Sequence, residues 1–425
     1  MLLHLRKGKP VDVLMYTISV RLYKLAILIA SLFNKKAKLW LEGRRDIFKN
    51  LQNAVGNGEK IIWMHCASLG EFEQGRPVLE QLRQQYPHYR LLLTFFSPSG
   101  YEIRKNYAGV DWVFYLPLDT RANAQRFIDT VKPSLSIFVK YEYWYHYLHQ
   151  LHQKNIPVIL ISAIFRENAP FFKWYGGVHR KMATYFHHLF VQTPESYERI
   201  TTIVPAERVS LTGDTRFDRV KTIADSFEAL PLIEQFIANK KILVAGSTWL
   251  EDELMLKKLV ENQADLSLII APHEITDTHL RFLKETFGEA VFYSELLKAD
   301  SGISSGRVLV IDNIGMLSKL YYYSLVSYIG GGFNKSGIHN TLEAAVYGKP
   351  VLFGPNYQKF AEAIGLIKNK AAFSYTTDTE LIQLTQSLLT NEDQLMEYSR
   401  NSGEFVASRT GATSLILSWL KKTAF

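Results

Sequence analysis

The chain has 425 residues, 47% of them hydrophobic and 21% charged, and it carries a formal net charge of +8. This composition excludes a disordered chain, and the length predicts two domains because a single core rarely grows beyond about 300 residues. The lone cysteine, Cys66, excludes an internal disulfide, and no Cys/His cluster has zinc-site spacing, so we expect Cys66 to be buried and the chain to hold no metal.

The excess of positive charge predicts an anionic partner. Nucleic acid fits poorly, because the sequence contains no zinc-finger spacing, no RNP-like aromatic segment and no long basic run with interleaved aromatic residues. A membrane surface fits better, because basic residues bracket an apolar stretch near the N-terminus, and such flanks suit anionic lipid headgroups. These basic residues are Arg6, Lys7, Lys9, Lys35, Lys36, Lys38, Arg44 and Arg45.

The apolar stretch itself has the pattern of an amphipathic helix. Its longest uncharged run, residues 25–33, is much shorter than the roughly 20 residues that a spanning helix needs, and Arg21 and Lys24 precede it. We therefore predict that residues 1–45 form an interfacial membrane anchor, retained because no small-residue cleavage site follows it. The alternative is a core helix of the first domain. The apolar residues that share one helical face are Leu14, Ile18, Leu22, Leu25, Ile29 and Leu32.

Strand-like and helix-like segments alternate beyond this stretch. Most of the strand candidates are continuous apolar runs, as is typical of buried parallel strands. We predict an α/β chain with two doubly wound, Rossmann-like domains that face a central cleft, joined by a linker near residues 216–235. The predicted strands lie at residues 61–66, 91–96, 112–118, 135–140, 157–163, 188–193 and 208–214, and then at residues 241–247, 266–272, 307–312, 325–332 and 350–355.

The stretch "HCASLGEFEQGRP", residues 65–77, places Gly70 and Glu71 where the first strand gives way to a helix. In an open α/β sheet this position opens toward the carboxyl ends of the strands, where ligands bind, so Glu71 is a candidate site residue. Alternatively, Glu71 only complements the positive end of the helix, with Ser68 as the cap.

The second half contains "YIGGGFNKSGIHNTLEAAVYGKPVLFGP", residues 328–355. Three glycines, residues 330–332, follow a strand, and His339, Asn340, Thr341 and Glu343 begin a helix-like segment. Glycines permit close backbone approach, and a helix N-terminus attracts phosphate, so the pattern fits a nucleotide site. It matches neither the dinucleotide fingerprint nor a P-loop, and a turn followed by a capped helix remains the alternative.

These motifs together resemble a 3-deoxy-D-manno-oct-2-ulosonic acid (Kdo) transferase. The resemblance implies a GT-B fold and an inverting transfer of Kdo from CMP-Kdo to a lipid A precursor (lipid IVA) in lipopolysaccharide synthesis, without a cofactor, on the cytoplasmic face of the inner membrane. It also implies an acceptor-binding domain at residues 46–220 and a CMP-Kdo-binding domain with a C-terminal helix at residues 221–425. The matching segments are "ASLGE" (67–71), "KYEYW" (140–144), "TGDTRFD" (212–218), "GSTWLEDE" (246–253), "IIAPHE" (269–274), "IDNIGML" (311–317) and "GGGFNKSGIHNTLEAAVYGKPVLFGP" (330–355).

The resemblance assigns three catalytic residues. Glu71 matches the glutamate that acts as general base, Glu142 matches a second family glutamate, and Arg216 stands where the family usually has lysine. Both Glu142 and Arg216 would support the transition state, and an arginine fork keeps the lysine's charge with a different geometry. The alternatives are a solvated helix-start carboxylate for Glu142 and an ordinary linker charge for Arg216.

The resemblance also implies three stretches that contact CMP. His273 stands where the family commonly has arginine, and residues 314–316 replace a common Met-Gly-Glu sequence. Since a neutral imidazole donates a single N–H, more of the phosphate binding is expected from the helix start near Asn340. Pro272 and Gly315 are alternatively strand-end and turn residues. The implied CMP contacts are Pro272, His273, Ile314, Gly315, Met316, Asn340, Thr341, Leu342 and Glu343.

Two other functions remain open at this stage. The first is a GT-B transferase or nucleotide-sugar epimerase with a different donor, because one fold hosts many substrates. The second is a non-catalytic scaffold at the membrane with a vestigial nucleotide site, although the presence of Glu71, Glu142 and Glu343 argues against such decay.

Overall fold

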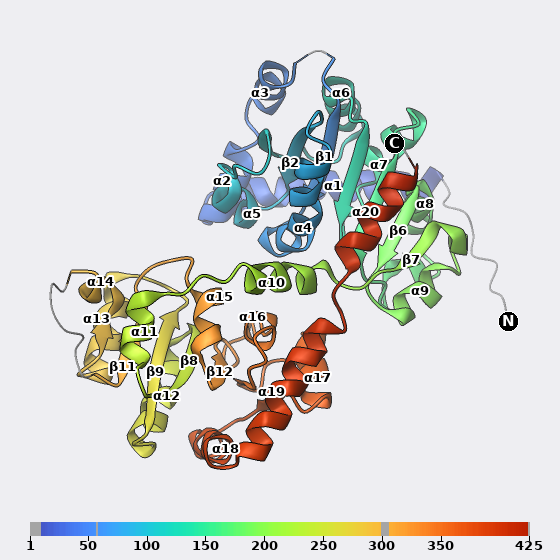
Figure 1. Ribbon diagram of the computed structural model, residues 1–425. Helices are drawn as coiled ribbons and strands as arrows, with labels where there is room; N and C mark the ends of the chain where they lie inside the picture. The colour runs from blue at the N-terminus through green and yellow to red at the C-terminus, as the bar shows by residue number, and fades with distance from the viewer. Residues whose placement is uncertain (1–9, 57, 299–305, 424–425) are drawn as a thin grey trace. The chain divides into compact units, whose positions relative to one another are not determined.

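A fully parallel seven-stranded sheet forms the centre of each half of the chain (Figure 1). The computed structural model describes residues 10–56, 58–298 and 306–423. They fall into two units: unit 1 contains the chain up to Arg219 and again from Gly411, and unit 2 is Val220–Thr410. The predicted α/β class with two doubly wound sheets is therefore confirmed. The predicted basic residues Arg6, Lys7 and Lys9 lie outside the described part of the chain.

The sheet of unit 1 has the strand order β3-β2-β1-β4-β5-β6-β7. Strand order reverses direction between β1 and β4, and this switch point is where open α/β sheets bind ligands, beyond the carboxyl ends of the strands. The strands are β1 (Ile61–Cys66), β2 (Arg90–Phe95), β3 (Trp112–Tyr115), β4 (Leu135–Val139), β5 (Val158–Ala163), β6 (His188–Val191) and β7 (Val209–Leu211).

Both faces of this sheet are buried. Along β1, Ile61 and Trp63 enter one hydrophobic core while Ile62, Met64 and Cys66 enter the other, so every residue of the strand is apolar or internally bonded. This explains the continuous apolar runs in the sequence. Helices that contribute to unit 1 are α1 (Pro10–Ala30), α2 (Lys35–Glu42), α3 (Ile47–Ala54), α4 (Leu69–Gln85), α5 (Pro98–Arg104), α6 (Arg121–Val131), α7 (Tyr145–Gln153), α8 (Gly177–Tyr185), α9 (Pro194–Ile200) and α20 (Ala412–Thr423).

Unit 2 repeats the arrangement with the order β10-β11-β9-β8-β12-β13-β14, so its switch point lies between β8 and β12. Two of its strands, β10 and β14, were not predicted; they have two and three residues and are recognised by their parallel pairing with β11 and β13. The strands are β8 (Lys241–Thr248), β9 (Leu266–Pro272), β10 (Val291–Phe292), β11 (Val308–Val310), β12 (Val326–Ile329), β13 (Val351–Phe353) and β14 (Ala372–Ser374). The helices are α11 (Pro231–Ile237), α12 (Leu250–Asn262), α13 (Asp277–Phe287), α14 (Tyr293–Leu296), α15 (Leu317–Leu320), α16 (Leu342–Ala345), α17 (Ala361–Lys368), α18 (Asp378–Thr390) and α19 (Glu392–Ala407).

The last helix, α20, belongs to unit 1 (Figure 1), whereas the sequence-based division assigned residues 221–425 to the second domain. The Asp218 carboxylate, in α10 (Thr215–Asp225), accepts hydrogen bonds from the backbone N–H groups of Gly411 (2.5 Å) and Thr413 (2.6 Å) and so caps the start of α20. Ile416 and Leu420 are fully buried in the core between the sheet and α4. No local sequence pattern predicts that the chain returns to unit 1 after residue 410.

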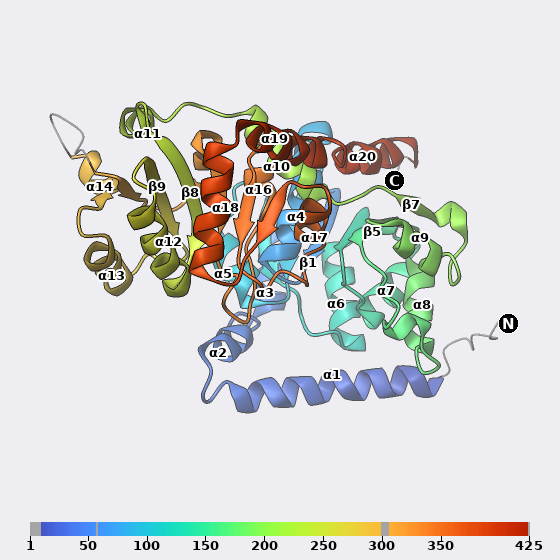
Figure 2. The ribbon, with the colours of Figure 1, turned by 90° about the horizontal axis from the view of Figure 1, so that it is seen from below.

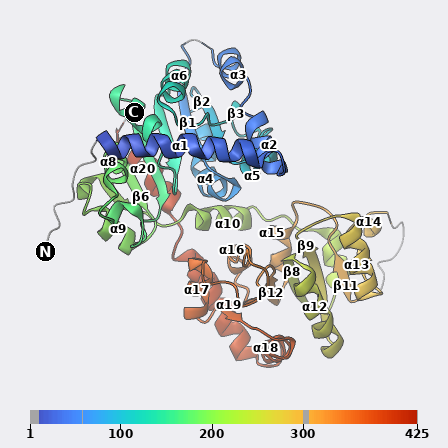
Figure 3. The same cartoon turned by 180° about the vertical axis from the view of Figure 1, so that it is seen from behind.

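Helix α1 lies along the side of unit 1, with α2 at one end and α8 at the other (Figures 2 and 3). Its inner side is bonded to the unit: the Tyr16 hydroxyl donates to the Asp119 carboxylate (2.6 Å), and the Thr17 hydroxyl contacts His146 Nε2 (3.0 Å). Val20 is buried against Trp40. The helix is therefore held to the protein along one side.

The opposite side of α1 is apolar and exposed. All six residues predicted to share an apolar face are exposed, from 41% at Ile18 to 75% at Leu32. The alternative of a core helix is therefore wrong. By length and composition alone, residues 11–30 also suffice to cross a membrane, but a crossing helix would have to leave the side of unit 1 that Tyr16 and Thr17 contact.

The Asp119 carboxyl makes this attachment sensitive to pH. Burial raises its pKa to about 6, against the effect of Tyr16 and two backbone N–H donors. Because an aspartate in the unfolded chain titrates near 4, the folded state retains a proton that the unfolded state releases between about pH 4 and pH 6, and stability falls as pH rises through that window. We therefore compare the free energies of unfolding of Asp119→Asn and the original protein in urea. Between pH 4 and pH 7, the difference should shift by about 3 kcal/mol in favour of the variant.

Asp129→Asn is the matched control, because Asp129 is exposed and pairs only with Lys154 at the surface (2.6 Å). The free energy of unfolding of this control should differ from that of the original protein by nearly the same amount at every pH. Parallel stability profiles for Asp119→Asn and the original protein would contradict the raised pKa of the buried Asp119 carboxyl.

Candidate functional site

Two glutamates lie at the carboxyl edge of the unit 1 sheet, one after each strand of the switch point. Glu71 follows β1 in the first turn of α4, and Glu142 follows β4. The burial of Cys66 at the end of β1 raises the pKa of its thiol, and Glu71 and Glu142 both raise it further through their charge. Both carboxylates therefore lie near the end of β1. We call Glu71, Glu142 and Arg216 the unit 1 site.

The position of Glu71 is as predicted, at a strand-to-helix junction. Ser68 occupies the N-cap position of α4, but its side chain makes no capping hydrogen bond. Its hydroxyl donates to the Glu71 carboxylate instead. Gly75, one turn later, brings α4 against the sheet, since a Cβ there would meet Met64 Sδ at 2.8 Å. The capping role considered for Ser68 is therefore wrong, and the helix start holds a half-buried carboxylate.

Glu142 is buried and held by two nitrogen donors. Its Oε2 lies 2.8 Å from His65 Nε2 and accepts from Trp144 Nε1 at 2.6 Å. The residue is only 5% exposed, so the alternative of a solvated carboxylate at a helix start is wrong. Among the described residues, Oε1 has no hydrogen-bond partner, so one oxygen is fixed by the protein and the other can serve a ligand.

A chain of buried donors orients His65. Trp63 Nε1 donates to the Thr94 hydroxyl (2.8 Å), which lies 2.9 Å from His65 Nδ1. Nδ1 also lies 3.1 Å from the Thr94 backbone oxygen, and Nε2 lies between Glu142 Oε2 (2.8 Å) and Trp144 Nε1 (3.2 Å). Polar neighbours on both ring nitrogens thus hold the imidazole in one orientation in the core.

Arg216, in the first turn of α10, is fixed by Asp214, which directly precedes that helix. Asp214 accepts from the backbone N–H of Arg216 and from its Nε, both at 2.9 Å, and its Oδ2 lies 2.8 Å from a second guanidinium nitrogen. Thr215 donates to the backbone carbonyl of Gln74, which lies in α4 one turn after Glu71. The start of α10, which carries Arg216, is thereby tied to the helix that carries Glu71, which an ordinary linker charge would not require.

The glycines of unit 2 are required by the protein's own packing. A Cβ on Gly330 would meet the Ser247 carbonyl oxygen at 2.3 Å, and one on Gly332 would meet the Gly354 nitrogen at 2.5 Å. Gly331 has a φ of +88°, which few other residues adopt. The cluster thus joins the carboxyl ends of β8, β12 and β13. This supports the structural alternative for the glycines and sets the positions of the segments around them.

Three rings stack where β8 and β9 end. His273 lies between Trp249 (ring centroids 4.6 Å apart) and His339 (4.4 Å apart). Burial lowers the pKa of both imidazoles, that of His339 to about 4. His273 is therefore neutral at pH 7 and replaces an arginine without supplying its charge.

The other predicted CMP contacts occupy loops at the same edge of the unit 2 sheet. Pro272 ends β9, and Gly315 turns the chain after β11 with a φ of +104°, next to Ile314, which is 92% exposed. Met316 is the N-cap residue of α15. We call all nine predicted CMP contacts the unit 2 site.

Asn340 and Glu343 bond to each other at the start of α16. The Asn340 side-chain amide donates to Glu343 Oε1 (2.9 Å) and its oxygen accepts from the backbone N–H of Leu342 (3.2 Å). Helix α16 is a single turn, so its dipole is weaker than that of the longer helix expected from the sequence. Between them, Thr341 is fully buried and its hydroxyl has no hydrogen-bond partner among the described residues.

Sequence reasoning missed the residues that support these side chains. His65, Thr94 and Trp144 lie on three different segments, and Trp249 lies 24 positions before His273, so no spacing rule connects them. A polar histidine inside an otherwise apolar strand was the available signal for His65. The described residues contain no group of three or more His, Cys, Asp or Glu side chains placed to hold a metal ion.

Residues 41–219 match the family model described as 3-Deoxy-D-manno-octulosonic-acid transferase (kdotransferase). The chain is 28% identical to the 3-deoxy-D-manno-octulosonic acid transferase of Haemophilus influenzae, over 85% of this chain and 86% of that protein. It is 29% identical to the 3-deoxy-D-manno-octulosonic acid transferase of Aquifex aeolicus, over 81% of this chain and 90% of that protein. The resemblance predicted from the motifs is confirmed.

Solved structures share the fold at low identity. The UDP-GlcNAc 2-epimerase from Neisseria meningitidis bound to UDP-GlcNAc matches with a TM-score of 0.60 and 14% identity, over 85% of this chain and all of that one. MurG from Acinetobacter baumannii matches with a TM-score of 0.54 and 16% identity, over 86% and 99%. At these identities the likeness concerns the fold alone, and it confirms the predicted GT-B class.

The bond between His65 and Glu142 can be measured through stability. His65→Phe keeps an aromatic ring but removes the N–H donor, which leaves a buried carboxylate with one partner; we expect a loss of about 3 kcal/mol in urea unfolding at pH 7. In the double variant with Glu142→Gln the loss should be smaller than the sum of the single losses by at least about 1 kcal/mol.

His188→Phe is the control, because His188 is also buried in unit 1 and its Nε2 contacts the neutral Ser210 hydroxyl (2.8 Å) instead of a carboxylate, while its ring packs on Phe190 and Trp419, contacts that phenylalanine can keep. Its loss should be about 1 kcal/mol, the usual contribution of a neutral hydrogen bond. Additive losses for His65→Phe and Glu142→Gln would show that the two residues are not coupled.

Proposed function

We propose that this chain, whose residues 41–219 match the Kdo transferase model, transfers Kdo from CMP-Kdo to a lipid A precursor. The observation that carries the proposal is the pair of carboxylates after β1 and β4 in the matching unit, one half-buried and one held by His65 and Trp144. Unit 1 supplies the reacting groups, and unit 2 binds the nucleotide.

Glu71 is the proposed general base. An acceptor sugar hydroxyl is a poor nucleophile, and a positioned carboxylate takes its proton as the new carbon–oxygen bond forms. The bond between the anomeric carbon of Kdo and the CMP phosphate breaks in the same displacement, and CMP leaves with the electron pair. Attack from the face opposite the leaving group inverts the anomeric centre.

Glu142 and Arg216 support this displacement from fixed positions. Since His65 and Trp144 hold Oε2, Oε1 is the oxygen of Glu142 that we propose to serve the bound sugars. The Arg216 guanidinium, aligned by Asp214, supplies positive charge for the developing charge on the phosphate. Groups that are already oriented need no reorganisation during the reaction.

Unit 2 is proposed to bind the CMP part of the donor. The Glu343 carboxylate accepts hydrogen bonds from the ribose hydroxyls, and the buried Thr341 hydroxyl gains the partner that it lacks in the protein. The stack of Trp249, His273 and His339 forms a flat aromatic surface beside Pro272. A neutral His273 contributes one N–H to the phosphate.

Helix α1 is proposed to hold the protein on the cytoplasmic face of the inner membrane. Its inner side is bonded to unit 1 through Tyr16 and Thr17, and its outer side is apolar over its whole length. A helix that presents one apolar side while the other is attached to a globular unit suits the lipid interface. The acceptor is itself a lipid, so this attachment keeps unit 1 beside its substrate.

Glu71→Gln tests the base directly. Glutamine keeps the size of the side chain but accepts no proton, so turnover with CMP-Kdo and a lipid A precursor should fall roughly 10²- to 10⁴-fold while CMP affinity stays constant. Glu73→Gln is the control, because Glu73 lies two residues further along α4 and pairs with Arg104 (3.0 Å). Near-normal turnover in Glu71→Gln would remove Glu71 from the mechanism and make Glu142 the next candidate base.

His273→Arg tests the donor site by adding charge. Arginine is planar, so it can keep the stack on Trp249, and its charged fork suits a phosphate better than a neutral imidazole. We expect CMP to bind about tenfold tighter in calorimetry. Asn262→Arg adds the same charge before β9, at the opposite edge of the sheet, and should leave affinity unchanged. Equal effects of the two variants would argue against phosphate contact at position 273.

A further inference from the structure

A cavity of about 460 Å³ in unit 1 gathers cationic side chains among its lining residues. It lies between α1, the segment that joins α2 to α3, and the start of α6. Five cationic side chains line it against a single carboxylate, that of Asp46. The cations are Lys24, Arg44, Arg45, Lys49 and Arg126. We call this the cationic cavity.

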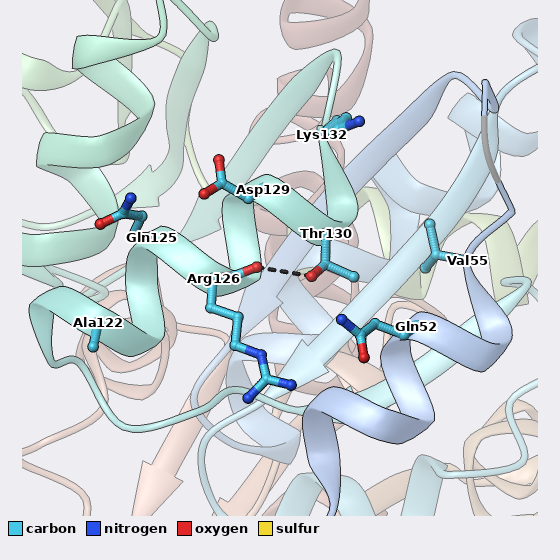
Figure 4. Close-up of a pocket in the computed structure, with 8 residues that line it drawn as sticks. All are labelled: Gln52, Val55, Ala122, Gln125, Arg126, Asp129, Thr130 and Lys132. Carbon is cyan, nitrogen blue, oxygen red and sulfur yellow. Dashed lines mark hydrogen bonds between the residues drawn. The ribbon is translucent and has the colours of Figure 1, made fainter.

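The cations at its rim lack acidic partners. Lys24, Arg45, Lys49 and Arg126 are exposed, and within the described part of the chain none lies within 4 Å of a carboxylate oxygen. Figure 4 shows a neighbouring cavity that Arg126 also lines, in which Arg126 and Asp129 point to different sides of α6. Like charges gathered without counter-charges repel one another, and a bound anion removes that repulsion.

Arg44 forms the interior of the cavity. Its guanidinium donates to the backbone carbonyls of Leu116 (2.9 Å), Trp40 (3.0 Å) and Phe96 (2.7 Å), and stacks 3.8 Å from the Trp40 ring centroid. Burial lowers its pKa to about 9, so it still carries its charge at pH 7. The wall is therefore both rigid and positive.

The cavity adjoins α1 at its packed side, one turn after the buried Val20. Lys24 comes from that helix, and its neighbours Leu25 and Leu28 are more than half exposed on the apolar side. A headgroup would thus meet the cations where its acyl chains meet the helix. Arginine forks match phosphate oxygens in pairs, whereas a lone lysine acts as a point charge.

An aromatic path connects the cavity with the unit 1 site. Trp40 lies 5.6 Å from Phe96, and Phe96 lies 4.6 Å from Trp144, the residue that donates to Glu142. Phe96 directly follows β2, and the cavity residues Pro117 and Leu118 follow β3, so the cavity opens at the same edge of the sheet as the two glutamates. A lipid held there lies beside the reacting groups.

We propose that the cationic cavity binds the phosphate group of a membrane lipid, either a bulk phospholipid or a phosphorylated acceptor. This inference rests on the membrane attachment of the proposed function but not on its chemistry. Several convergent cations favour a phosphomonoester, with up to two charges, over a phosphodiester with one.

The test measures binding of the full chain to phosphatidylcholine vesicles that contain phosphatidic acid or phosphatidylglycerol, matched in surface potential. The original protein should prefer phosphatidic acid. R45Q/K49Q/R126Q leaves Arg44 in place; it should bind phosphatidic acid vesicles at least about tenfold more weakly and lose the preference, since each cation near an anionic surface contributes roughly fivefold. Circular dichroism checks that the variant folds.

K35Q/K36Q/K38Q is the matched control, because it removes the same charge from the neighbouring helix α2. It should weaken binding to both lipids alike and keep the preference. Wild-type preference in R45Q/K49Q/R126Q, or its loss in the control, would overturn the assignment of the site.

Two further arms identify the source of the phosphate. Vesicles with a diphosphorylated lipid A precursor, compared with phosphatidic acid at equal charge, distinguish the acceptor from bulk lipid, and stronger binding to either supports a lipid phosphate. Inorganic phosphate that competes as well as either lipid would overturn a lipid ligand. Binding is measured without donor, so a protein that transfers no Kdo would still give a clear result here.

Discussion

The reversal of strand order beside β1 and beside β8 is the constraint on which both candidate sites depend. The crossover connections on the two sides of such a switch point run in opposite directions. The loops that follow the two central strands therefore diverge, and a crevice opens between them at the carboxyl edge of the sheet. In unit 1 those loops carry Glu71 and Glu142. In unit 2 they carry Trp249 and the three glycines. The strand order alone therefore determines that both candidate sites lie at these edges of the sheets.

The fold class and the location of Glu71 could be predicted because their signals are local. Continuous apolar runs identify strands buried on both faces, and a helical pattern directly after such a run locates the junction. Strands β10 and β14, of two and three residues, were not predicted; β7, β11 and β13 are as short as β14 but lie within predicted strands, so pairing of β10 with β11 and of β14 with β13 is what defines the missed strands. The exposed side of α1 was also predictable, since its period of three to four residues is a property of the segment alone.

The support of the site could not be predicted in the same way. His65 and Glu142 are 77 positions apart, and their contact depends on the pairing of β1 with β4 and on the course of the loop after β4. The glycines of unit 2 illustrate the opposite error: their pattern suggests a ligand, whereas each is required by the protein's own packing or backbone conformation. Distinguishing a ligand from a neighbouring strand requires coordinates. The family resemblance supplied roles for residues such as Glu142 that their local pattern left undecided.

The return of α20 to unit 1 has a consequence for biosynthesis. Unit 2 is one continuous segment, Val220–Thr410, inserted into a unit 1 that is complete only when residues from Gly411 onward have been made. During translation, unit 2 can therefore finish folding while unit 1 still lacks the helix that covers α4 and buries Ile416 and Leu420. Until α20 has emerged from the ribosome, the nascent chain must protect this incomplete apolar core while the exposed side of α1 is already outside.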